Sequence, residues 1–134
     1  MTEETKTETI DPSKLRGLEL VFHYQNKLQE RLGTWDKIRD NPNLKQQWIN
    51  QMILAMFEET VEIMRETPYK NPNFVPFGWK KTQIGDPEKL KEELVDLLHF
   101  FVNLCIGADL KPDELVQRYL DKNKINHERQ DHGY

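Results

Sequence analysis

Apolar residues recur three or four positions apart through most of this chain, which is the spacing of one face of an α-helix. The first segment where this spacing is clear contains Leu18, Val21, Phe22, Leu28 and Leu32. No segment alternates apolar and polar residues as a half-buried strand would. The sequence therefore predicts an all-α protein.

Prolines and short polar residues indicate where the helices begin and end. Asp11-Pro12 and Asp86-Pro87 each place a good N-cap residue before a proline that suits the first helical turn. Gly33 suits the end of a helix. We expect a bundle of four to five helices, with long helices near residues 12–32, 43–66, 87–106 and 112–124 and one or two further turns at 34–40.

Length, charge and cysteine content narrow the class of protein. The 134 residues suit a single domain, 1–134, in which the polar residues 1–10 form a flexible tail and no signal peptide. The net charge of −4 argues against binding to nucleic acid, and no apolar run is long enough to span a membrane. The one cysteine, Cys105, lies in an apolar run and is expected in the core. Together these features predict a cytoplasmic protein.

Two pairs of acids are the clearest candidate for chemistry. Glu59 and Glu62 lie three apart in one expected helix, and Glu93 and Asp96 lie three apart in the next, with no Lys or Arg four positions further on. Paired acids on a helix usually form a solvated face. If the pairs face each other, the four like charges cannot all ionise without a cation. Oxygen ligands favour Mg²⁺, with Mn²⁺ as a possible substitute, and the absence of His and Cys from the set disfavours zinc.

Amide and aromatic residues add a second set of candidates. Gln25 lies within the apolar stripe of the first expected helix, where a buried amide needs a partner or a ligand. The segment 67–85, between the two acidic helices, is rich in aromatic residues and long for an idle loop. Apolar residues also cover more of the two acidic helices than one small bundle would bury, which favours a homodimer.

The paired acidic segments and three further segments resemble motifs of one enzyme family. The segments "EETVE" and "EELVD" match the ExxE and ExxD motifs of the all-α nucleoside triphosphate pyrophosphatases of the MazG-like superfamily. The segments "LVFHYQNKLQERL", "FVPFGWKK" and "KNKINHERQDHGY" resemble the first helix, the Trp/Lys loop and the C-terminal segment of the dimeric-type dUTPases. The resemblance covers the chain from about Leu18 to Tyr134.

The resemblance implies Mg²⁺-dependent hydrolysis of dUTP, and of dUDP, to dUMP, with release of pyrophosphate from dUTP. Glu59, Glu62, Glu93 and Asp96 would hold the Mg²⁺, and Glu59 or Glu62 would orient and deprotonate the attacking water. The implied residues for substrate binding are Gln25 and Asn103 for the uracil and sugar, Trp79 for the base, and Lys81, Lys122, Asn126, Arg129 and Tyr134 for the phosphates or for closing the site.

Three alternatives stay open at this stage. Lys80 competes with Lys81 for the role in the Trp/Lys loop. Another pyrophosphatase of the same superfamily would act on dCTP or on damaged nucleotides. A non-enzymatic helical interaction protein would use its acids for solubility alone.

Overall fold

The computed structural model describes residues 10–67 and 85–133, and within them the chain is helical without strands, as expected. The expected tail lies outside the described residues except for Ile10, as does most of the segment 67–85. The elements are the 3-10 helix η1 (Pro12–Lys14) and the α-helices α1 (Gly17–Leu32), α2 (Thr34–Ile38), α3 (Pro42–Arg65), α4 (Pro87–Gly107) and α5 (Pro112–Asp131).

The two acidic helices begin as the sequence predicts. The side chain of Asn41 accepts hydrogen bonds from the backbone N–H groups of Asn43 and Leu44, and proline opens the first turn of α3. Asp86 does the same for Glu88 and Lys89 at the start of α4. Each cap satisfies two N–H groups that the helix itself leaves without a partner.

The expected first helix, 12–32, is wrong at its start. Asp11 caps only the single turn of η1, by accepting from the Ser13 N–H, and the chain is extended at Arg16. Gly17 then begins α1 with a φ of +54°, which residues with a side chain rarely adopt. The Arg16 guanidinium donates to the carbonyls of Ser13 and Leu15, so these groups are satisfied outside a continuous helix.

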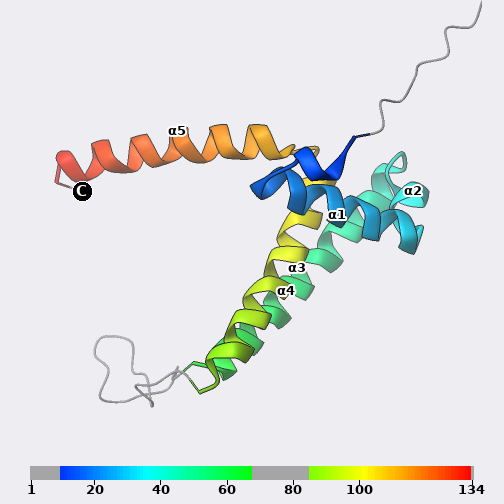
Figure 1. Ribbon diagram of the computed structural model, residues 1–134, viewed down its shortest axis with the longest axis horizontal. Coiled ribbons are helices and arrows are strands. Elements are labelled where there is room, and N and C mark those ends of the chain that lie inside the picture. Colours follow the sequence, from blue (N-terminus) through cyan, green and yellow to red (C-terminus); the bar gives the residue numbers. More distant parts are fainter. Residues whose placement is uncertain (1–9, 68–84, 134) are drawn as a thin grey trace, which may run out of the picture.

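Helices α3 and α4 run antiparallel side by side, and α1 crosses the pair near the end of α4 (Figure 1). The small core lies at this crossing, where Phe22 of α1 packs with Val102 and Cys105 of α4. Cys105 is therefore a core residue, as predicted. Helix α5 leaves from the same end and projects away from the lower part of the α3–α4 pair (Figure 1).

Helix α5 differs from the expected bundle packing. It extends to Asp131, seven residues beyond the predicted end at 124, and it has no buried residue. Leu115, in its first turns, packs against the core cluster. The packing expected for residues 112–124 is thus confined to the start of the helix, because the residues that follow are mostly polar or charged.

The register of α3 against α4 decides which side chains meet. A Cβ atom added at Gly107 would lie 3.0 Å from the Trp48 ring, and the Asn103 amide donates to the Met52 sulfur at 3.5 Å. Moving four residues forward along α3, from Trp48 to Met52, therefore corresponds to moving four residues back along α4, from Gly107 to Asn103. Near the other end, Lys89 forms an ion pair with Glu66 at 3.2 Å in the same register. One antiparallel register thus holds along the whole pair.

We expect Gly107→Ala to lower the free energy of unfolding by about 1–3 kcal/mol, measured by urea denaturation, because the added methyl group meets the rigid Trp48 ring and Ile49 at 3.0 and 3.2 Å. Gly85→Ala is the matched control, since its added methyl group would have its nearest contact at 3.6 Å. A stability gain in Gly107→Ala, as at an open helical position, would contradict close packing at this crossing.

Candidate active site

Three carboxylates converge between α3 and α4. One oxygen from each of Glu59, Glu93 and Asp96 lies within 4.8 Å of the other two. The register explains the meeting, because Glu59 is seven residues after Met52 and Asp96 is seven residues before Asn103. Seven residues are close to two helical turns, so the acids lie on the same faces as the Met52–Asn103 contact. The expected facing of the two acidic pairs is therefore present in the fold.

The electrostatics of the cluster are unfavourable when all its members are ionised. A hydrogen bond with Glu62, then burial, then the charges of Glu62, Glu59 and Asp96 raise the pKa of Glu93. Burial, then the charges of Glu62, Asp96 and Glu58, raise the pKa of Glu59. Glu62 thus acts on both neighbours although it is not among the three converging oxygens. The four expected acids form one electrostatic unit.

One atom of this unit is buried without a partner. Oε2 of Glu59 has no hydrogen-bond partner among the described residues, although buried polar oxygens almost always have one. No Lys or Arg lines the adjacent cavity in the described part of the chain. An all-oxygen donor set with one buried, unpartnered oxygen fits a hard divalent cation such as Mg²⁺.

Three buried amides lie two turns away from the acids. Gln25 and Gln29 of α1 both donate to Oδ1 of Asn103, at 2.7 and 3.1 Å. The predicted residues Gln25 and Asn103 therefore contact each other directly. No role was predicted for Gln29, which also contacts Asn103. Gln29 lies four residues after Gln25 and therefore on the same face of the helix, and this spacing could have predicted that the two side chains share a partner.

A cavity of about 620 Å³ connects the amides to the acids. It lies between α1, α3 and α4, and its lining includes Gln25, Gln29 and Asn103 at one end and Glu59 and Asp96 at the other. Trp48 and Phe100 add aromatic surface to the wall. The cavity therefore combines an apolar wall, directional amides and an anionic end in one space.

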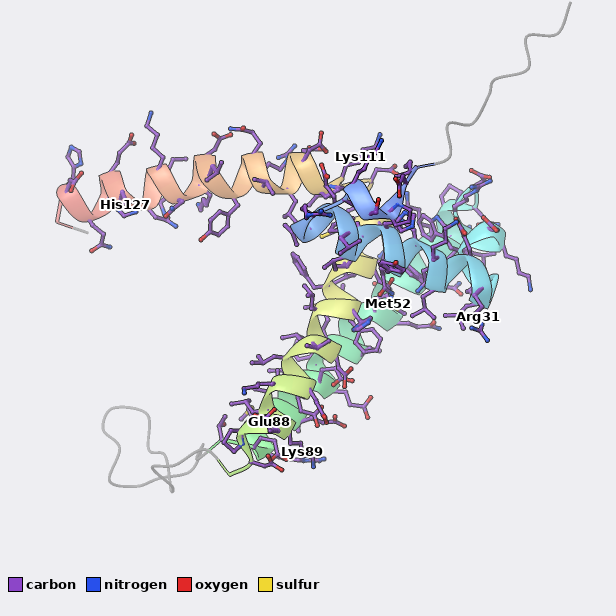
Figure 2. The ribbon with its side chains drawn as sticks, viewed as in Figure 1. Arg31, Met52, Glu88, Lys89, Lys111 and His127 are labelled. Carbon is purple, nitrogen blue, oxygen red and sulfur yellow. The ribbon has the colours of Figure 1, made fainter. Side chains whose placement is uncertain are left out.

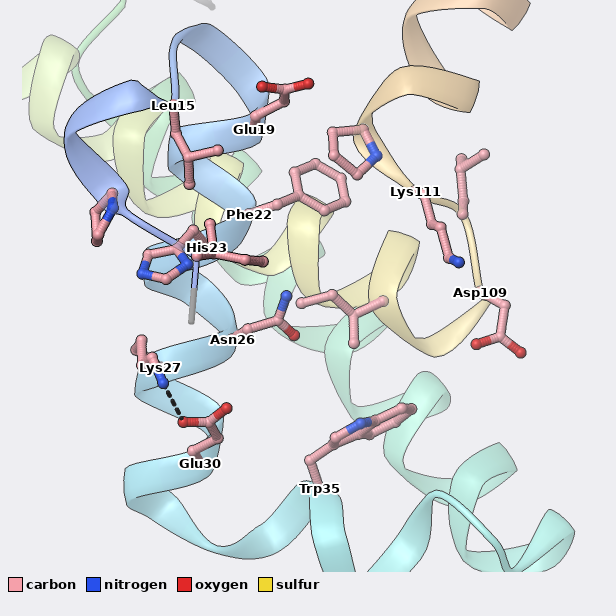
Figure 3. A pocket seen from close by; sticks show the side chains of 15 residues that line it. Leu15, Glu19, Phe22, His23, Asn26, Lys27, Glu30, Trp35, Asp109 and Lys111 are labelled. Atoms are coloured by element: carbon pink, nitrogen blue, oxygen red, sulfur yellow. Dashed lines mark hydrogen bonds and ion pairs between the residues drawn. The ribbon is translucent and has the colours of Figure 1, made fainter. Parts of the chain in front are cut away.

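A larger cavity of about 900 Å³ lies on the other side of α1 (Figure 3). Its lining includes Phe22, Trp35, Asp109 and Lys111, and Lys27 pairs with Glu30 at its rim at 3.0 Å. Charges of both signs are spread around this cavity, and the acid cluster is not part of it. The smaller cavity is the better candidate, because converging groups indicate a site more strongly than volume does.

The other predicted residues lie elsewhere or outside the described part. Trp79, Lys80, Lys81 and Tyr134 fall outside the described residues. Lys122, Asn126 and Arg129 follow one another four and three apart on α5, so they share one face of that helix, as expected. This face lies on the projecting helix, away from the acid cluster of the same chain (Figure 1).

The ExxE and ExxD acids that meet on this antiparallel helix pair resemble the motifs of the all-α pyrophosphatases of the MazG-like superfamily. The dUTPase family model matches residues 17–114 and 101–134, and the chain belongs to this family.

Two phage proteins are similar to part of this chain. The dCTP pyrophosphatase of Enterobacteria phage T4 is 45% identical over 49 residues, which are 37% of this chain and 29% of that protein. The dCTP pyrophosphatase of Enterobacteria phage LZ5 is 41% identical over 58 residues, which are 41% of this chain and 34% of that protein. The match thus spans about a third of the length of each relative.

No solved structure is significantly similar to the chain. No helix in the described part is long and apolar enough to cross a membrane.

We expect Glu93→Gln to raise the melting temperature of the metal-free protein at pH 7, measured by circular dichroism. The pKa of Glu93 is raised above its ordinary value of 4.5, so its ionised form destabilises the fold at neutral pH, and this cost disappears as the pH falls to that value. Glu92→Gln is the control, since its exposed side chain lies outside the cluster. Equal effects of both changes would show that repulsion in the cluster does not limit stability.

Proposed function

We propose that this protein hydrolyses dUTP to dUMP and pyrophosphate with the help of Mg²⁺, or of Mn²⁺ in its place, and that it also hydrolyses dUDP to dUMP. The observation that carries the proposal is the convergence of Glu59, Glu93 and Asp96 at one end of an amide-lined cavity, with one buried oxygen that has no partner among the described residues. Membership in the dUTPase family supports the same reaction. It also argues against a non-enzymatic interaction protein.

The acids have two tasks in this proposal. Glu59, Glu62, Glu93 and Asp96 would hold the cation, which neutralises charge on the triphosphate when it is bound. Glu59 or Glu62 would accept a hydrogen bond from the attacking water and then its proton. Glu59 also carries the buried oxygen Oε2, which has no hydrogen-bond partner among the described residues and is available to accept this bond.

The amides would hold the base. Each amide offers one acceptor oxygen and two donor hydrogens, which is what the edge of a pyrimidine requires. With both glutamines donating to Asn103 Oδ1, the Asn103 nitrogen has the Met52 sulfur at 3.5 Å as its acceptor. Sulfur is a weak acceptor, so a carbonyl oxygen such as that of uracil would be a better partner.

A second candidate substrate is dCTP. If the side-chain amides of Gln25, Gln29 and Asn103 each rotate by 180°, their oxygen and nitrogen atoms exchange places. The Asn103 nitrogen would then donate to both glutamine oxygens, so the two hydrogen bonds would be kept with their direction reversed. The reversed network would present an acceptor where the first presents a donor, which suits the amino group of cytosine. The names of the two phage relatives favour this candidate.

We also propose that the protein is a homodimer. Exposed apolar rows run along α3 (Leu54, Phe57, Val61) and α4 (Leu94, Leu98, Phe101), and Leu54 and Phe57 are each 67% exposed. A single chain leaves these rows in water, and contiguous apolar surface of this kind usually marks an interface. A second copy of the chain is the partner that family membership suggests.

The first test compares pyrophosphate release from dUTP, dCTP and dTTP in the presence of Mg²⁺. We expect turnover of dUTP, and loss of nearly all of it in Asp96→Asn and Glu59→Gln, because each change removes a charge that the cation requires. Glu92→Gln should behave like the wild type. Near-normal activity of Asp96→Asn would show that the cluster is not the site.

The second test concerns base selection. Gln25→Leu should reduce kcat/KM for dUTP by about five-fold to 150-fold, the effect of leaving about 1–3 kcal/mol of hydrogen bonding unmade. It should also change the ratio of the dUTP and dCTP values, because the base edges differ. Gln47→Leu, at an exposed position of α3, is the matched control. An equal loss with every nucleotide would instead indicate a structural role for Gln25.

A further inference from the structure

The side of α4 that carries the acids and the amide also carries a lysine. Asn103, Asp96, Glu93 and Lys89 lie seven, three and four residues apart, so they follow one stripe along the helix. Along this stripe the amide comes first, the two acids follow, and a positive charge comes last. Lys89 lies 14 residues from Asn103, which is about 21 Å along the axis. The proposed function gives roles to the first three residues and none to Lys89.

Helix α3 supplies the partner of Lys89. The Nζ atom of Lys89 lies 3.2 Å from Oε1 of Glu66, four residues after the acid Glu62. The side chain of Glu66 is 15% exposed and that of Lys89 is 55% exposed. The carboxylate is thus mostly covered, while the lysine side chain stays open to solvent. Figure 2 shows Lys89 near the end of the α3–α4 pair that lies away from α1 and Met52.

The ammonium group of Lys89 is charged and has donors to spare. Its hydrogen bond with Glu66, and then the charges of Glu66, Glu93 and Asp86, raise the pKa of Lys89, so the group is protonated at neutral pH. An ammonium has three N–H donors, and the ion pair with Glu66 uses one of them. Exposed ion pairs contribute little to stability, so the ammonium can turn toward a second anion at small cost.

The order of groups along the site indicates which anion this would be. With the base at the amides, the phosphates of a nucleotide extend along the cavity toward the acids, and the third phosphate lies farthest from the base. A triphosphate carries more negative charge than one divalent cation neutralises. The cavity beside the acids has no Lys or Arg among its described lining residues. Lys89 lies one helical turn beyond Glu93, in the direction in which the phosphates extend.

We propose that Lys89 binds the third phosphate of the nucleotide and thereby makes the site prefer triphosphates to diphosphates. Its ammonium would donate to a terminal phosphate oxygen, while Glu66 keeps the side chain directed toward α3. A diphosphate ends one phosphate earlier and would not reach this ammonium. The inference rests on the proposed function, since it requires the base at the amides and the phosphates at the acids.

The test compares kcat/KM for the triphosphate and the diphosphate of the nucleoside that the wild type turns over best. Lys89→Ala should lower the value for the triphosphate by about ten-fold, the low end of what a hydrogen bond between charged groups contributes, because the side chain is half exposed. The value for the diphosphate should stay close to that of the wild type. Lys89→Arg keeps the positive charge and should recover most of the preference for the triphosphate.

Two further variants separate phosphate binding from the stability of the helix pair. Lys91→Ala is the matched control, because Lys91 pairs with Glu88 at 2.7 Å on the same helix but lies about 200° round it from Lys89. It should behave like the wild type with both nucleotides. Glu66→Gln removes the charge of the ion pair, keeps Lys89, and should not lower the value for the triphosphate. A loss in Glu66→Gln as large as that in Lys89→Ala would show that the ion pair acts through the fold, and would overturn the inference.

Equal losses for the triphosphate and the diphosphate in Lys89→Ala, or no loss with either, would overturn it as well. Calorimetric titration with the non-hydrolysable α,β-imido analogues of both nucleotides makes the same comparison for binding, and it covers a wild type that hydrolyses the triphosphate alone. A wild type that turns over no nucleotide would contradict the proposed function. An active wild type whose preference for the triphosphate is unchanged in Lys89→Ala would contradict the inference alone.

Discussion

The antiparallel register of α3 against α4 is the constraint on which the rest of the structure depends. Moving along the pair, the same register places Trp48 against Gly107, Met52 against Asn103, and Glu66 against Lys89. It also forces Glu59 toward Asp96 and Glu62 toward Glu93, where like charges meet. Tight packing at one end of the helix pair and the ion pair at the other end hold α3 against α4. Between them, the carboxylates of the acid cluster repel one another. A proton or a cation relieves that repulsion, which couples occupancy of the site to stability.

Helix geometry also fixes the separation between the two ends of the cavity. Asp96 and Asn103 are seven residues apart on α4, which corresponds to about 10 Å along the axis. Met52 and Glu59 show the same separation on α3. The acids and the amides are therefore held at a set distance by two rigid helices, without a loop between them. A site built on such elements keeps its groups in place more accurately than a site built on loops.

Much of this arrangement could be predicted from the sequence, because it depends on local signals. Asp86-Pro87 indicated the start of α4, and the three-residue spacing of the acids indicated the faces on which they lie. The start of α1 could not be predicted, since Asp11-Pro12 fits a single 3-10 turn as well as a helix, and the difference lies in the φ of Gly17. Predicting the shared acceptor of Gln25 and Gln29 required knowing how α1 crosses α4, and sequence spacing does not contain that information.

The isolation of α5 was also beyond the sequence, and it has a thermodynamic consequence. The polar composition of residues 117–131 indicates exposure, but only the fold shows that the helix points away from its own acids. None of the residues of α5 is buried, and its recorded packing is at Leu115, near its start. A helix without tertiary packing is only marginally stable in water, so residues 117–131 are expected to open more readily than α3 and α4, which pack against each other along their length.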